Sequence, residues 1–125
     1  MAKLLIIDDD EVSARFFGEI LTSMGHRVAA LGSAVDAAEV VGEITPDLIL
    51  MDLEMPEVDG TEATRRLKQI PEFNSIPVVI LTAHSEVQAF DEVQAAGADG
   101  FLNKQSDRPT IERTIESALA GRRSG

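Results

Sequence analysis

Three short, unbroken apolar runs dominate the pattern of hydrophobic and polar positions along the chain. They cover residues 4–7, 48–51 and 78–81, and none of them is long enough to form a buried helix. A continuous run of this length is typical of a strand covered by helices on both faces, whereas a half-exposed strand alternates. Two weaker strand candidates, 27–31 and 100–102, complete a set of five.

Between these runs, apolar residues recur at intervals of three and four, which predicts five amphipathic helices. We expect them over residues 11–24, 33–44, 61–70, 86–96 and from about 107–109 onward. The residues predicted to face the core are Val12, Phe16, Phe17, Ile20, Leu21, Met24, Ala37, Val40, Val41, Ile44, Ala63, Leu67, Phe90, Val93, Ile111, Ile115 and Leu119. Of the adjacent pair Phe16 and Phe17, one ring is expected to be partly exposed. Strands alternating with helices predict a doubly wound α/β fold with a five-stranded parallel sheet.

Turn-forming residues mark the expected helix ends. Gly25 stands where a helix C-terminus favours glycine, and Gly97 is expected to end the fourth helix. Thr45 precedes a proline and should avoid helical angles. Ser33, followed three residues later by Asp36, resembles a capping arrangement at the start of the second helix.

The composition indicates one globular domain. The chain has 125 residues, of which 44% are hydrophobic and 26% charged. Cysteine is absent and there are two histidines, which excludes disulfides, a cysteine nucleophile, iron–sulfur clusters and His-rich metal sites. No apolar stretch is long enough to span a bilayer, and the N-terminal run is too short for a signal sequence. We therefore expect a cytoplasmic protein without a membrane partner.

The balance of charge is strongly acidic. Eleven basic residues against 22 acidic ones leave a net charge of −11. A chain with this charge repels the phosphates of nucleic acids, so we expect no direct nucleic-acid binding through this domain.

Polar side chains follow four of the five predicted strands. Asp8 and Asp9 follow the first, Asp52 the third, Thr82 the fourth and Lys104 the fifth. Doubly wound sheets bind ligands beyond the carboxyl ends of their strands, where these side chains would gather. Crowded carboxylates repel one another, and oxygen ligands without Cys or His favour Mg²⁺. A hydroxyl and an ammonium group nearby predict phosphoryl transfer, in which a carboxylate can itself be the nucleophile.

Five sequence pieces at these strand ends resemble the receiver domain of two-component response regulators. They are IIDDD at 6–10, LMDLEMP at 50–56, DG at 59–60, VILTA at 79–83 and AGADGFLNK at 96–104. The likeness covers residues 3–120. It implies the flavodoxin-like, CheY-like three-layer fold with strand order 2-1-3-4-5. We expect one receiver domain over residues 1–120 and a flexible tail over 121–125.

The resemblance implies a magnesium site at the acidic residues. Asp52 would be the phosphoacceptor, and it would bind Mg²⁺ together with Asp9 and the backbone carbonyl of Glu54. Asp8 would assist through a coordinated water. The Glu54 side chain lies two residues after Asp52, at a position where family members tune the lifetime of the phosphoryl group.

The resemblance also implies a conformational switch. Thr82 would hydrogen-bond a phosphoryl oxygen, Lys104 would pair with the same group, and Phe101 would move inward as Thr82 shifts. The family usually carries a cis proline after this lysine, but here Gln105 follows Lys104. A cis bond before a residue other than proline costs about 3–4 kcal/mol, so the direction of the ammonium group stays open at this point.

The resemblance implies a histidine kinase or a histidine phosphotransfer protein as phosphoryl donor. A downstream protein or output domain would read the fourth helix, fifth strand and fifth helix, and homodimer formation stays open. The domain would then be a signalling phosphoacceptor rather than an enzyme. Two alternatives remain. Gln105 and Glu54 support a pseudo-receiver that binds partners without accepting phosphate, and the loop 52–54, an acid-x-acid sequence, suggests a small Mg²⁺-dependent phosphatase.

Overall fold

Five strands alternate with five helices along the chain, as the hydrophobic pattern predicts. The computed structural model describes residues 2–83 and 87–124. The strands are β1 (Lys3–Ile7), β2 (Arg27–Leu31), β3 (Leu48–Asp52), β4 (Val78–Thr82) and β5 (Gly100–Asn103). The helices are α1 (Glu11–Ser23), α2 (Ala37–Ile44), α3 (Gly60–Lys68), α4 (Val87–Ala95) and α5 (Arg108–Ser124).

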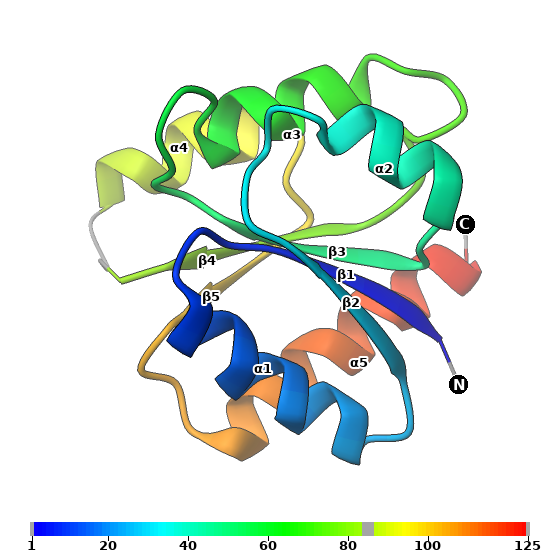
Figure 1. Cartoon of the computed structure of the whole chain (residues 1–125), viewed down its shortest axis with the longest axis vertical. Helices are drawn as coiled ribbons and strands as arrows, with labels where there is room; N and C mark the ends of the chain where they lie inside the picture. Colours follow the sequence, from blue (N-terminus) through cyan, green and yellow to red (C-terminus); the bar gives the residue numbers. More distant parts are fainter. Residues whose placement is uncertain (1, 84–86, 125) are drawn as a thin grey trace.

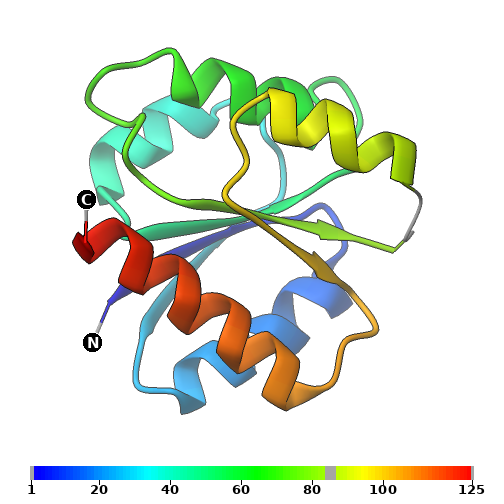
Figure 2. The same ribbon diagram turned by 180° about the vertical axis from the view of Figure 1, so that it is seen from behind.

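The strands form one parallel sheet in the order β2-β1-β3-β4-β5, which confirms the predicted fold class and strand order. Helices α1 and α5 cover one face of the sheet, and α2, α3 and α4 cover the other (Figure 1). The view from behind shows the same three layers with α5 in front (Figure 2). The register pairs Asp52 with Leu81 and Thr82 with Asn103, so the carboxyl ends of β3, β4 and β5 lie level.

Successive residues of the central strands enter two separate cores. In β1, Leu4 and Ile6 pack with α1 and α5, whereas Leu5 and Ile7 pack with α2, α3 and α4. All four side chains are buried. Burial of apolar surface stabilises the fold by about 25 cal/mol per Å², and here both faces of the strand contribute. The unbroken apolar runs in the sequence follow from this two-sided burial.

Helix α1 packs on the sheet through only part of its apolar surface. Its buried residues are Phe17, Ile20 and Leu21. Phe16 is 47% exposed and meets the ring of Phe17 edge-on, with ring centroids 5.2 Å apart. Val12 is 79% exposed, so the prediction that it faces the core is wrong. Val12 lies on the edge of the apolar stripe, and hydrophobic spacing alone does not show which part of a wide stripe meets the sheet.

The ends of α2 differ in part from expectation. Ser33 accepts a hydrogen bond from the backbone N–H of Val35 (3.1 Å), and Asp36 precedes α2 without a side-chain capping bond, so the expected capping arrangement does not form. Thr45 avoids right-handed helical angles, as expected, by adopting a left-handed conformation with φ 48°. Gly25 follows α1 with a φ of +94°, which confirms its predicted role at that helix end.

The later helices also differ slightly from their predicted bounds. Helix α3 ends at Lys68 rather than at residue 70. Glu86, the predicted start of the fourth helix, and the side chain of Phe90 lie outside what the structure describes. Helix α5 continues to Ser124, through residues where a tail was expected to begin at Gly121. Within the described residues, no helix is both long and apolar enough to cross a membrane.

Candidate functional site

Four strand ends bring acidic, hydroxyl and ammonium groups to one edge of the sheet. Asp8 directly follows β1, and Asp52 is the last residue of β3. Thr82 ends β4 and Lys104 follows β5. The backbone N–H of Lys104 donates to the carbonyl of Thr82 (2.8 Å), and that of Asp8 donates to the carbonyl of Leu31 (3.0 Å). These residues therefore lie at the edge where doubly wound sheets bind ligands.

Asp8, Asp9 and Asp52 form a tight cluster of carboxylates. One oxygen from each lies within 4.8 Å of the other two. Asp8 and Asp52 are 3% and 5% exposed, whereas Asp9 is exposed. The cluster thus has a buried floor and one member open to solvent. Hard oxygen donors with room for water on one side fit a Mg²⁺ ion, which keeps several waters when a protein binds it.

Lys104 places its ammonium group against the buried members of this cluster. Its Nζ lies 3.1 Å from Asp8 Oδ2 and 3.5 Å from Asp52 Oδ1. All peptide bonds within the described ranges are trans, including Lys104–Gln105. A turn in which the N–H of Gln105 donates to the side-chain oxygen of Asn103 (2.8 Å) follows β5 instead. The ammonium group of Lys104 therefore points toward the acids, and it reaches them without a cis bond.

Asp52 is the acid whose ionisation the fold opposes. Burial raises the pKa of Asp52 to about 7, with further contributions from the charge of Asp8 and from hydrogen bonds with Asp8 and Asp9. The ammonium group of Lys104 opposes this rise without cancelling it. A cation in the site would stabilise the ionised form of Asp52, which is the form able to act as a nucleophile.

The pKa of Asp8 shifts in the opposite direction. Burial by itself would raise the pKa of Asp8, but the N–H of Asp10, the hydroxyl of Ser13 and the Lys104 ammonium outweigh burial and lower it. The Asp10 N–H donates to Asp8 Oδ1 at 2.9 Å. Although burial opposes the charged form of Lys104, its acidic neighbours raise the pKa of the lysine. Both pKa shifts therefore favour a charged Asp8–Lys104 pair beside Asp52.

The turn after Asp52 depends on a glycine. The N–H of Gly60 donates to the carbonyl of Leu53 (2.8 Å). A Cβ atom at residue 60 would overlap the carbonyl oxygen of Asp52 and come within 2.9 Å of the Cα of Leu53. Asp59 caps α3 by accepting from the N–H of Glu62 (2.8 Å). The Asp59-Gly60 pair thus holds the loop that carries Asp52 against the first turn of α3.

Three further predicted residues lie nearby, and their roles stay predictions. Thr82 is half-buried at the end of β4, and Glu54 is exposed two residues after Asp52. Phe101 is half-buried in β5 and packs against the core beneath α2, α3 and α4. Side-chain contacts therefore unite Asp8, Asp9, Asp52 and Lys104, and strand register brings Thr82 to the same edge.

Ser13 is a site residue that sequence reasoning missed. Its hydroxyl oxygen is buried, and it lowers the pKa of Asp8. Its position four residues before Phe17 puts it on the buried side of α1, where polar residues are rare. The sequence does contain a signal for this residue. Ser13 lies within the buried stripe of a helix that directly follows the acids Asp8, Asp9 and Asp10.

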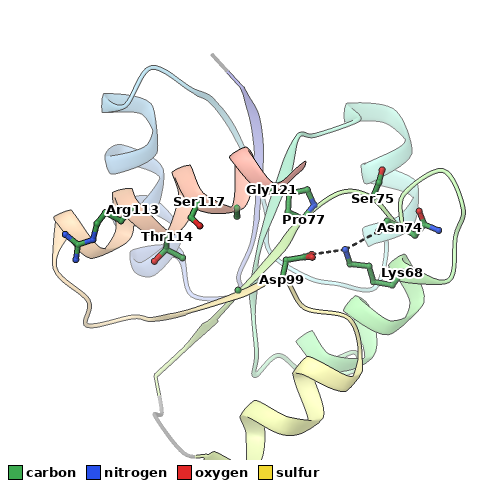
Figure 3. Close-up of a pocket in the computed structure, with 11 residues that line it drawn as sticks. Lys68, Asn74, Ser75, Pro77, Asp99, Arg113, Thr114, Ser117 and Gly121 are labelled. Atoms are coloured by element: carbon green, nitrogen blue, oxygen red, sulfur yellow. Dashed lines mark hydrogen bonds and ion pairs between the residues drawn. The ribbon is translucent and has the colours of Figure 1, made fainter. Parts of the chain in front are cut away.

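A separate hollow lies at the amino ends of β4 and β5 (Figure 3). It measures about 780 Å³ and includes Arg113 of α5. Lys68 Nζ donates to the Asp99 carboxylate (2.8 Å) and to the carbonyls of Ile76 (2.8 Å) and Asn74 (3.3 Å). With its three N–H groups so engaged, Lys68 ties α3 to the starts of two strands instead of offering a charge to a ligand.

The chain resembles known proteins over nearly its whole length. Residues 4–116 match the family described as the response regulator receiver domain. The polar-differentiation response regulator DivK of Brucella ovis is 31% identical over 116 residues, which are 93% of this chain and 94% of DivK. A putative response regulator from Chloroflexus aurantiacus is 28% identical with a TM-score of 0.91, over 95% of this chain and 98% of that one. The receiver domain of a histidine kinase from Syntrophus aciditrophicus is 29% identical with a TM-score of 0.88, over 97% and 92% of the two chains.

Proposed function

The chain belongs to the response regulator receiver domain family, and from this premise we propose that it accepts a phosphoryl group on Asp52 and thereby changes which partner it binds. The family consists of signalling domains of two-component systems rather than conventional enzymes. Magnesium dependence and phosphoryl transfer are general to the family, and the site described above supports both for this chain.

The proposed reaction is a transfer from a phosphohistidine of a histidine kinase or a phosphotransfer protein. A carboxylate oxygen of Asp52 attacks the phosphorus atom. The new O–P bond forms as the N–P bond of the donor breaks, and the electron pair stays on the imidazole nitrogen, which takes a proton from water. The product is an acyl phosphate on Asp52. The attack needs the ionised carboxylate, so the raised pKa of Asp52 links reactivity to the charges around it.

Asp9, Asp52 and the backbone carbonyl of Glu54 would hold Mg²⁺, with Asp8 acting through a water. The ion would supply positive charge to the carboxylates and to the phosphoryl oxygens. The ammonium group of Lys104 would move partly away from Asp8 and Asp52 and would interact with the incoming phosphoryl group. Its 3.5 Å distance from Asp52 Oδ1 already puts it within reach of that group.

One observation carries this proposal. Three carboxylates lie within 4.8 Å of one another, and the ammonium group of Lys104 lies 3.5 Å from Asp52 Oδ1. Carboxylates at this spacing repel one another unless a cation lies among them. Lys104 supplies one positive charge for three negative ones, so the site as folded has a deficit that a divalent cation would correct.

We propose that Thr82 and Phe101 couple phosphorylation to the surface formed by α4, β5 and α5. Phosphorylation adds about −1.5 to −2 charge units at the sheet edge. Thr82 ends β4 beside Asn103 of β5, so a movement of its hydroxyl toward the phosphoryl group would be felt on the strand that carries Phe101. A downstream protein, an output domain or a second copy of the chain would read that surface.

The test is phosphorylation by a small-molecule donor. The protein is incubated with acetyl phosphate and Mg²⁺, and the intact mass is measured with and without EDTA. We expect the mass of one added phosphoryl group with Mg²⁺, and no adduct with EDTA or in Asp52→Asn. Asp36→Asn is the matched control, because Asp36 is an exposed acid whose side chain caps nothing.

The same measurement distinguishes the alternatives. Absence of an adduct, under conditions in which another receiver domain is labelled, would overturn the phosphoacceptor proposal in favour of a pseudo-receiver. Repeated release of phosphate from a phosphate ester, with more than one turnover for each protein molecule, would favour a small phosphatase instead.

A further inference from the structure

Ser13 lies on the first turn of α1, directly after the acids that follow β1. Its backbone N–H donates to the carboxylate of Asp10 (3.5 Å), and the N–H of Asp10 donates to Asp8 Oδ1 (2.9 Å). These two hydrogen bonds through Asp10 connect the first turn of α1 to Asp8. Residue 13 also belongs to the face of α1 that carries Phe17 and packs on the sheet, so its side chain does not point to solvent.

Two buried oxygens in this region lack an ordinary hydrogen bond. Within the described residues, Asp8 Oδ2 and Ser13 Oγ are buried, and neither has a hydrogen-bond partner at normal length and angle. The Lys104 ammonium lies 3.1 Å from Asp8 Oδ2 and balances part of its charge. Burying a polar atom without a hydrogen bond costs free energy, and a hydrogen bond between two such atoms would remove that cost.

Lys104 cannot neutralise Asp8 by itself in every state of the proposed phosphorylation cycle. Its ammonium group is shared between Asp8 and Asp52 in this structure. A phosphoryl group on Asp52 would draw the ammonium toward its own oxygens. Asp8 Oδ2 would then be a buried anionic oxygen, while the buried hydroxyl of Ser13 has no other partner among the described residues.

We propose that Ser13 is a positioning residue of the metal site: when the site is filled, its hydroxyl donates to Asp8 Oδ2 and holds that carboxylate in the orientation that serves the ion. This inference rests on the proposed function, since it assigns to Ser13 a role in the same site. Groups that orient metal ligands through a hydrogen bond typically contribute about 10–100-fold to metal affinity. Ser13 would act through Asp8, and it would touch neither the ion nor the phosphoryl group.

The experiment measures Mg²⁺ affinity by isothermal titration calorimetry on the metal-free full chain. The variants are Ser13→Ala, which removes the hydroxyl, and Ser13→Thr, which keeps it. Thr22→Ala is the matched control, because Thr22 is an exposed hydroxyl residue near the other end of α1. We expect Ser13→Ala to weaken Mg²⁺ binding by about 10-fold, and Ser13→Thr and Thr22→Ala to stay near the wild-type value.

A second readout separates positioning from general damage to the fold. In the acetyl phosphate assay, Ser13→Ala should need more Mg²⁺ for half-maximal labelling and reach the same maximal rate at saturating Mg²⁺. If Ser13→Ala loses its far-ultraviolet circular dichroism signal, Ser13→Cys replaces it, because cysteine keeps the shape and donates only weakly. Wild-type affinity in folded Ser13→Ala or Ser13→Cys would overturn the role of Ser13 alone. Absence of Mg²⁺ binding in the wild-type chain would overturn the proposed function itself.

Discussion

Replacing Asp52 by asparagine should stabilise the metal-free protein at alkaline pH. Asparagine has nearly the shape of aspartate, carries no charge and can donate hydrogen bonds to the neighbouring Asp8 and Asp9. The pKa of Asp52 is raised from its usual value of 3.8 to about 7 in the folded chain. The folded state therefore holds a proton that the unfolded state has released. Stability from this group is complete below about pH 4 and is lost as the pH rises through 7.

The magnitude follows from the distances in the site. At an effective dielectric constant of about 20, each carboxylate within 4.8 Å of an ionised Asp52 costs at least about 3 kcal/mol. The Lys104 ammonium, 3.5 Å away, returns about 5 kcal/mol. The remaining repulsion is about 1–2 kcal/mol, and burial of the charge adds to it. The raised pKa sets an upper bound of about 4 kcal/mol. We therefore expect Asp52→Asn to raise the free energy of unfolding by about 2–3 kcal/mol at pH 8.

The assay is urea unfolding followed by circular dichroism, because the chain has no Trp or Tyr for fluorescence. Both proteins are measured in EDTA at pH 5 and pH 8, with Asp36→Asn as control. The gain in stability should be clear at pH 8 and much smaller at pH 5, where Asp52 keeps its proton in the folded state. Saturating Mg²⁺ at pH 8 should stabilise the wild type and leave Asp52→Asn little changed. An equal gain at both pH values, or a loss at pH 8, would refute the reasoning.

Three other substitutions test the packing of the fold. Gly60→Ala should lower the free energy of unfolding by about 2 kcal/mol or more and abolish labelling by acetyl phosphate, because its Cβ would overlap the backbone of Asp52. Gly18→Ala should instead raise it by about 1 kcal/mol, since its Cβ would make ordinary contacts with Ile6 and Val28 of the sheet and alanine favours a helix. Thermal unfolding compares the two variants, and the same sign for both would contradict this account. Lys68→Met should lower it by about 1–3 kcal/mol in urea unfolding, because Asp99 and two carbonyls lose their donor, while phosphorylation persists; unchanged stability would mean that the lysine is dispensable.

The sheet was predictable from the sequence because its strands are buried on both faces. Residues 4–7, 48–51 and 78–81 have no polar position that could face water, and strands in such runs pair in a parallel sheet. The site was predictable for a related reason. Parallel strands end at one edge of the sheet, so the acids after β1 and at the end of β3 meet there however the helices pack.

The rotation of α1 was not predictable from hydrophobic spacing. Val12 and Ser13 are neighbours, and the apolar pattern favoured burial of the valine. The structure exposes Val12 and buries the hydroxyl of Ser13, because the helix begins beside Asp8 and meets the sheet through Phe17. Burial of this hydroxyl depends on how α1 lies against the end of β1, and spacing along the chain does not give that position.

By itself, therefore, the sequence determined the order of the elements, the burial of the central strands and the identity of the acids that meet at one edge. Tertiary structure decided which charged side chains of the site contact one another. Lys104 and Asp8 are 96 residues apart, yet their contact lowers the pKa of Asp8, and burial together with the charge of Asp8 raises the pKa of Asp52 to about 7. A pKa is set by burial and by distances between charges, and neither quantity exists along the chain until the strands have paired.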